Sequence, residues 1–140
     1  ERIICYATGN DTDWHMELGF EATKLACPYG PGDGLTGLEG NEQLVAKTRE
    51  LIGPNVELML DCWMASDLEF AVRLGERLRP YGLKWMEDCL IPEDFQGFTS
   101  GCPGRPWPPA NIGILHSRAF KPPATGSSTI FSRTSSGSAA

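Results

Sequence analysis

Short apolar runs alternate with amphipathic stretches along the first 98 residues of the chain. Four of these runs have the length and the turn-residue borders of β-strands, at residues 3–7, 20–25, 56–60 and 83–86. Helical spacing predicts three helices between them, at residues 13–18, at residues 41–52, and from a capping box formed by Ser66 and Glu69 up to Pro80. The regular alternation of strand and helix predicts a parallel α/β sheet with right-handed crossovers.

Such a sheet is either an open, doubly wound sheet or an arc of a (β/α)8 barrel, and both forms place their chemistry at the carboxyl ends of the strands. The segment 27–37 follows the second predicted strand and is rich in Gly and Pro, which makes it a candidate active-site loop. It contains neither of the glycine-rich patterns that bind phosphate groups in nucleotide-binding proteins. The sequence therefore does not favour a nucleotide site in this loop.

Charge divides the chain into two unlike parts. The formal net charge is −6, which argues against binding to nucleic acid and to a membrane surface, and no apolar run is long enough to span a membrane. All eighteen acidic residues lie in residues 1–94, whereas residues 95–140 contain four basic residues and no acid. Because Ser, Pro and Gly dominate this second part, we expect residues 99–140 to be a disordered C-terminal tail.

Five cysteines are present, and none of them is spaced as a CxxC pair. With only two histidines beside them, they suggest neither a zinc site nor a disulfide framework. Reduced, mostly buried thiols are typical of cytoplasmic proteins, so we expect a cytoplasmic location.

Two of the predicted strands end in a carboxylate, Asp61 after Leu-Met-Leu and Glu87 after Lys-Trp-Met. Adjacent parallel strands would bring these two acids together at one edge of the sheet. Oxygen ligands with no His or Cys partner suit Mg²⁺, so Asp61 and Glu87 are candidate Mg²⁺ ligands. The alternative is that Asp61 only caps the following loop and that Glu87 is only solvated.

The sequence around these acids, at residues 58–64 and 83–90, resembles the enolase superfamily in its mandelate racemase and muconate lactonizing enzyme branch. The match is tightest to L-rhamnonate dehydratases and related sugar-acid dehydratases. It implies a partial (β/α)8 TIM barrel of about four βα units, in which Asp61 and Glu87 are the first two Mg²⁺ ligands. It also implies that full-length relatives form homo-oligomers.

Residues 19–26 look like the second strand of that barrel, where racemizing relatives carry Lys-x-Lys. Lys24 is present here, but Ala26 stands at the position of the second lysine. The resemblance therefore speaks against a two-base racemase and is compatible with dehydration. Lys24 either orients the substrate or packs its stem along the rim of the barrel.

The activity that the resemblance implies is Mg²⁺-dependent dehydration of a sugar acid. A base removes the proton α to the carboxylate, the metal stabilises the resulting enediolate, and loss of the β-hydroxyl gives a 2-keto-3-deoxy acid. The third metal ligand and the general base of the family have no counterpart in this chain, so we expect no turnover by these 140 residues alone. Two alternatives remain: another α/β enzyme with a nucleotide or phosphoryl-transfer role, and a non-catalytic truncated product.

The resemblance covers residues 1–98 and then stops. The family would next supply a strand that ends in Thr-Gly-Glu-His-Trp-Tyr-Thr. Residues 108–115 can be written in synonymous codons that give this peptide when they are read from the third base of each codon. We therefore interpret residues 1–98 as a barrel fragment and residues 99–140 as an out-of-frame translation, the alternative being a genuine low-complexity tail.

Overall fold

One parallel sheet organises the computed structural model of the chain, which describes residues 3–94 and 113–115. All neighbouring strands pair in parallel, and their order across the sheet follows the sequence. The strands are β1 (Ala7–Thr8), β2 (Ala22–Ala26), β3 (Glu57–Asp61), β4 (Trp85–Glu87) and β5 (Gly113–Leu115). A sequential parallel order with a helix between strands is the order of a (β/α)8 barrel, and the predicted α/β class is confirmed.

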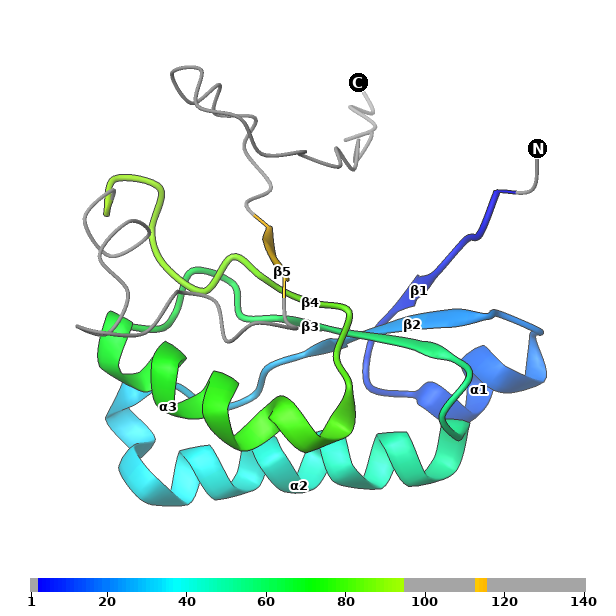
Figure 1. Ribbon diagram of the computed structural model, residues 1–140, viewed down its shortest axis with the longest axis horizontal. Helices are drawn as coiled ribbons and strands as arrows, with labels where there is room; N and C mark the ends of the chain where they lie inside the picture. Colours follow the sequence, from blue (N-terminus) through cyan, green and yellow to red (C-terminus); the bar gives the residue numbers. More distant parts are fainter. Residues whose placement is uncertain (1–2, 95–112, 116–140) are drawn as a thin grey trace, which may run out of the picture.

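The helices of the described residues lie on one side of this sheet, as Figure 1 shows. They are α1 (Thr12–Glu17), α2 (Gly34–Ile52) and α3 (Leu68–Leu78), with short 3₁₀ turns η1 (Pro31–Asp33) and η2 (Arg79–Tyr81). None of the helices among residues 3–94 is long and apolar enough to cross a membrane. An arc of a barrel has this arrangement, because the helices form the outer ring and the other face of the sheet forms the interior.

The hydrophobic core lies between the sheet and the helices. Because successive side chains of a strand point to opposite faces, Leu58, Leu60 and Cys62 all point toward the helices. Leu74 and Leu78 of α3 pack against them and are fully buried. The intervening residues of the strands therefore point to the face that no described helix covers, and this face carries the polar side chains considered below.

The first strand is only Ala7–Thr8, not residues 3–7 as expected, and two helix boundaries also differ from the sequence-based expectations. The second helix begins at Gly34 and not near residue 41, so most of the predicted active-site loop 27–37 is η1 and the first turn of α2. Close packing requires two glycines of α2, since a Cβ on Gly37 would lie 2.6 Å from the Asp33 Cβ and one on Gly40 would lie 2.5 Å from the Tyr29 ring. Packing thus overrides the low helix propensity of glycine.

The cap of α3 is the second difference. Ser66 was expected to cap this helix, but the carboxylate of Asp67 accepts a hydrogen bond from the Phe70 amide at 2.8 Å. Ser66 instead donates its backbone N–H to the Cys89 carbonyl at 3.1 Å, which ties it to the segment after β4. Asp67 is therefore the last extended residue before the helix, and Asp is as effective a cap as Ser.

The predicted division into a barrel fragment at 1–98 and a frameshifted, unstructured tail at 99–140 falls largely outside the described residues and stays a prediction. Within that range the structure describes Gly113–Leu115, which form β5 beside β4. The edge of β4 offers unpaired backbone groups, and an extended segment satisfies them. His116, which needs no functional role if the tail is out of frame, lies outside the described residues, as does Cys102.

Candidate functional site

The two predicted metal ligands lie side by side. Asp61 and Glu87 are partners in the β3–β4 register, and Ala26 is the partner of Asp61 in β2. Residues in register point to the same face of a sheet, so these three positions form one row across the carboxyl ends of the strands. Lys24 is two residues before Ala26 and points to the same face, from one step further back along the strand.

Lys24 joins the two acids. Its ammonium nitrogen Nζ lies 2.8 Å from Glu87 Oε2 and 3.0 Å from Asp61 Oδ2. All three residues are buried, with 4–8% of their surface exposed. Burial lowers the pKa of Lys24, but its hydrogen bonds to Glu87 and Asp61 outweigh burial and hold this pKa above its ordinary value. Lys24 is therefore a charged bridge between the two acids, whatever packing its stem makes along the rim.

Both carboxylate oxygens of Asp61 have a partner within the chain. Its Oδ1 accepts the backbone N–H of Trp63 at 3.1 Å, so the carboxylate does cap the loop that follows β3. Its Oδ2 faces Lys24. The capped turn is sharp, because Trp63 and Met64 have φ angles of 55° and 58°, a region that costs energy for residues with a side chain. Glu87, which was expected to be a ligand or else solvated, is buried.

Two aromatic residues complete the site. The indole N–H of Trp85 donates to Glu87 Oε2 at 3.4 Å, and the Tyr6 ring meets Trp85 edge to face with centroids 6.2 Å apart. Lys24 Nζ lies 5.6 Å from the centre of the Tyr6 ring, within the range of a cation–π contact. Tyr6 was missed, and the only sequence signal for it was an aromatic residue in the first predicted strand.

The donor set of the site suits a small divalent cation. Two carboxylates face a single ammonium, so the ionised cluster has one excess negative charge and attracts a further cation; if the ammonium turns away, the two carboxylates match the charge of a divalent ion. Mg²⁺ is commonly held by one or two carboxylates together with water and substrate oxygens. Within residues 3–94 and 113–115 no group of three or more His, Cys, Asp or Glu residues forms a complete metal site. Asp61 and Glu87 would thus supply two ligands.

Three cysteines lie near the same end of the sheet, in the segments that follow β2, β3 and β4. The hydrogen bond between the Cys27 and Cys62 thiols lowers the pKa of Cys27 and raises the pKa of Cys62 well above its usual value. Cys89 donates a hydrogen bond to Cys62 with 3.8 Å between the sulfurs. The cysteines of the described residues are free thiols, of which Cys62 and Cys89 are buried as expected, whereas Cys27 is half-buried and Cys5 is exposed.

Comparison with known proteins gives this arrangement a context. Residues 12–100 match the family described as enolase C-terminal domain-like. The L-rhamnonate dehydratase of Saccharopolyspora erythraea is 44% identical over 98 residues, which are 70% of this chain and 25% of that enzyme. The chain thus spans about a quarter of the length of this relative. The family match ends at residue 100.

Solved structures give the same picture. The rhamnonate dehydratase of Gibberella zeae complexed with Mg superposes with a TM-score of 0.68 and is 28% identical, with 80% of this chain and 27% of that chain covered. A racemase from Streptomyces coelicolor with bound magnesium gives a TM-score of 0.59 at 28% identity, with 68% and 28% covered.

Proposed function

This chain belongs to the enolase C-terminal domain-like family, and on that basis we propose that it is part of a Mg²⁺-dependent sugar-acid dehydratase similar to L-rhamnonate dehydratase. The observation that carries the proposal is the buried pair Asp61 and Glu87, which Lys24 bridges at the carboxyl ends of adjacent parallel strands. A buried site with excess negative charge needs a cation, and solved relatives contain magnesium. The substrate that we propose is a small sugar acid.

Each residue of the cluster has a distinct part in this proposal. Asp61 and Glu87 would hold the metal, and the Trp63 amide keeps the Asp61 carboxylate oriented. Bound Mg²⁺ would supply stabilisation of the negative charge that develops when the proton α to the substrate carboxylate is removed. Lys24 would orient the substrate by giving its ammonium group to the sugar-acid carboxylate once a second cation faces the acids. Tyr6 and Trp85 would limit the access of water.

Ala26 bears on whether the proposed site racemises its substrate or eliminates water from it. It lies in register with Asp61, so a lysine at this position would stand directly beside the metal site as a second base. A methyl group cannot exchange protons, which favours elimination over racemisation. Position 26 of β2 therefore provides no base. We propose that the complete enzyme supplies the base for α-proton removal from outside this chain.

Magnesium binding gives a direct test. We expect Mg²⁺ to stabilise the 140-residue chain, by about 1.4 kcal/mol at ten times its dissociation constant. Asp61→Asn and Glu87→Gln each remove one carboxylate and should abolish this stabilisation. The measurement is thermal or urea unfolding with and without MgCl₂ at constant ionic strength, which separates binding from screening.

Asp13→Asn is the matched control, because it removes an exposed acid on α1 and should leave the Mg²⁺ effect intact. An equal Mg²⁺ effect in wild type, Asp61→Asn and Asp13→Asn would show that the ion binds elsewhere and would contradict the proposed ligands.

We expect no turnover by these 140 residues. The site described here has two candidate metal ligands and a lysine, but it lacks the third metal ligand and the general base of the family. Incubation with Mg²⁺ and L-rhamnonate, followed by an assay for 2-keto-3-deoxy acid, should give no more product than Asp61→Asn gives. Product above that control would mean that the chain is catalytically complete.

Family membership argues against the nucleotide or phosphoryl-transfer alternative. The loop 27–37 also argues against it, because much of this loop is the start of α2 and is tightly packed on Tyr29. A non-catalytic truncated product is separated from the proposal by the Mg²⁺ test, because a misfolded chain would show no ion effect that depends on Asp61. A cytoplasmic location and homo-oligomeric full-length relatives stay predictions.

A further inference from the structure

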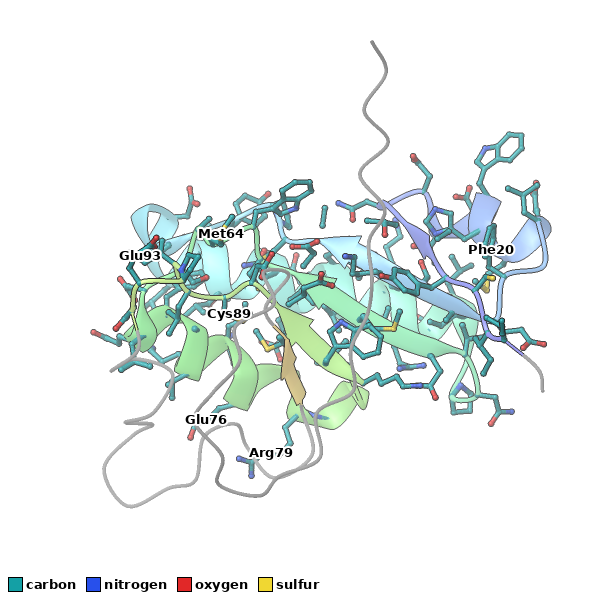
Figure 2. All side chains as sticks on the ribbon, turned by 90° about the horizontal axis from the view of Figure 1, so that it is seen from above. Phe20, Met64, Glu76, Arg79, Cys89 and Glu93 are labelled. Carbon is teal, nitrogen blue, oxygen red and sulfur yellow. The ribbon has the colours of Figure 1, made fainter. Side chains whose placement is uncertain are left out.

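Three thiols form a continuous chain beneath the acid and lysine site. Cys62 directly follows Asp61, and its side chain points into the core with 2% of its surface exposed. Cys89 lies two residues after Glu87 and is fully buried, at the end of the sheet where Met64 and Glu93 also lie in Figure 2. The sulfur atoms of Cys62 and Cys89 are 3.8 Å apart. Formation of a disulfide would shorten this distance to a bond length near 2.0 Å.

Cys27 connects this buried pair to the surface. It lies just after β2, is half-buried, packs against the core cluster that contains Cys62 and Cys89, and donates its thiol to the Tyr29 carbonyl at 3.5 Å. Its backbone N–H also donates to the Asp61 carbonyl at 2.8 Å, which holds the two segments together. The three sulfurs thus run from a partly exposed position into the core, and Cys62 is the central one because it contacts both others.

We propose that Cys27, Cys62 and Cys89 are an oxidation site at which a hydroperoxide produces a Cys62–Cys89 disulfide, with Cys27 as the entry thiol. Peroxide reaches Cys27, whose sulfur takes up one oxygen to form a sulfenic acid while the peroxide leaves as water or an alcohol. The Cys62 sulfur attacks that sulfenic acid, so that a Cys27–Cys62 bond forms and water leaves. Cys89 then attacks the Cys62 sulfur, which transfers the disulfide to Cys62–Cys89 and returns Cys27 to its thiol form.

The position of this disulfide gives it a consequence for the neighbouring site. Cys62 donates its backbone N–H to the Glu87 carbonyl at 2.8 Å, and Ser66 donates to the Cys89 carbonyl at 3.1 Å. A bond between Cys62 and Cys89 would covalently join the segments that leave β3 and β4, immediately beyond the two acids. The oxidation site does not depend on the proposed dehydratase function, because it uses different side chains on the opposite face of the sheet.

The test is disulfide mapping on the folded 140-residue chain with Cys5 and Cys102 replaced by serine, so that only the three thiols remain. After treatment with hydrogen peroxide, quenching by alkylation, digestion and mass spectrometry, we expect the Cys62–Cys89 peptide pair, which dithiothreitol should reverse. Cys27→Ser should slow its formation at least about tenfold, because peroxide then reaches only buried thiols. Cys89→Ser should stop the reaction at Cys27–Cys62.

The mapping of the three-thiol chain needs no core substitution, so it is decisive even if a serine variant folds poorly. Three thiols that all remain alkylatable, or a Cys27 that is oxidised to sulfinic acid without any disulfide, would overturn the proposal. Equal rates in Cys27→Ser and in the three-thiol chain would overturn the role of Cys27 as the entry point. The same treatment in denaturant is the control, and there the pairs should lose their preference for Cys62–Cys89.

Discussion

Lys24→Met is expected to lower the free energy of unfolding by about 3–5 kcal/mol, the usual cost of leaving a buried charge without its partner. Methionine fills a volume similar to that of the lysine stem but leaves the Asp61 and Glu87 carboxylates facing each other without the ammonium that bridges them. Their repulsion in a buried position is the reason for the loss. Urea unfolding of the variant and of the wild-type chain measures it.

Lys84→Met is the matched control, because Lys84 also pairs with an acid, Glu57 at 3.0 Å, but both side chains are more than 40% exposed. Exposed pairs contribute at most about 1 kcal/mol, so this variant should stay close to wild type. Adding Asp61→Asn and Glu87→Gln to Lys24→Met should restore much of the stability. Mg²⁺ should stabilise Lys24→Met more than it stabilises wild type, since no ammonium competes for the acids. Equal losses in Lys24→Met and Lys84→Met would contradict this account.

Leu74→Ala is expected to lower the free energy of unfolding by about 3–5 kcal/mol. Leu74 lies in the middle of α3, is fully buried, and belongs to the cluster that fills the space between the helices and the sheet. Truncation removes its apolar contacts and leaves a cavity that α3 cannot close without losing its contacts with β3. Denaturant unfolding followed by circular dichroism gives the change.

Leu51→Ala is the matched control, because it makes the same substitution without leaving a cavity in the core. Leu51 is also in a helix, α2, but 56% of its surface is exposed, so the change should stay within about 0.5 kcal/mol. If Leu74→Ala were as mild as Leu51→Ala, the core between α3 and the sheet would not be packed as described.

The sequence analysis predicted the order of the elements and the pairing of the two acids, and both follow from simple periodicity. An apolar run closed by an acid shows where a buried strand reaches the edge of its sheet, and parallel order then makes Asp61 and Glu87 neighbours. Lys24 could be assigned to the second strand in the same way. Its two ion pairs could not be predicted, because they depend on side-chain reach across three strands and on burial that a linear pattern does not record.

Other features were set by contacts between distant residues. Ser66 and Asp67 are equally good caps in isolation, and the choice between them depends on the hydrogen bond from Ser66 to Cys89. The start of α2 depends on Tyr29, whose side chain packs against glycine positions of this helix that have no room for a Cβ. The thiol chain joins three segments that are remote in sequence, so spacing alone could not show it.

The divided bonding of the Asp61 carboxylate has a consequence for the rate at which ions exchange. Since Oδ1 holds the Trp63 amide while Oδ2 faces Lys24, a cation that takes the place of the ammonium disturbs only one oxygen and leaves the strained turn in place. The slowest motion required is then the rotation of one lysine side chain, a far faster event than the rearrangement of a backbone loop. Loading of the proposed Mg²⁺ site would then be limited by the arrival and dehydration of the ion, and not by a rearrangement of the protein.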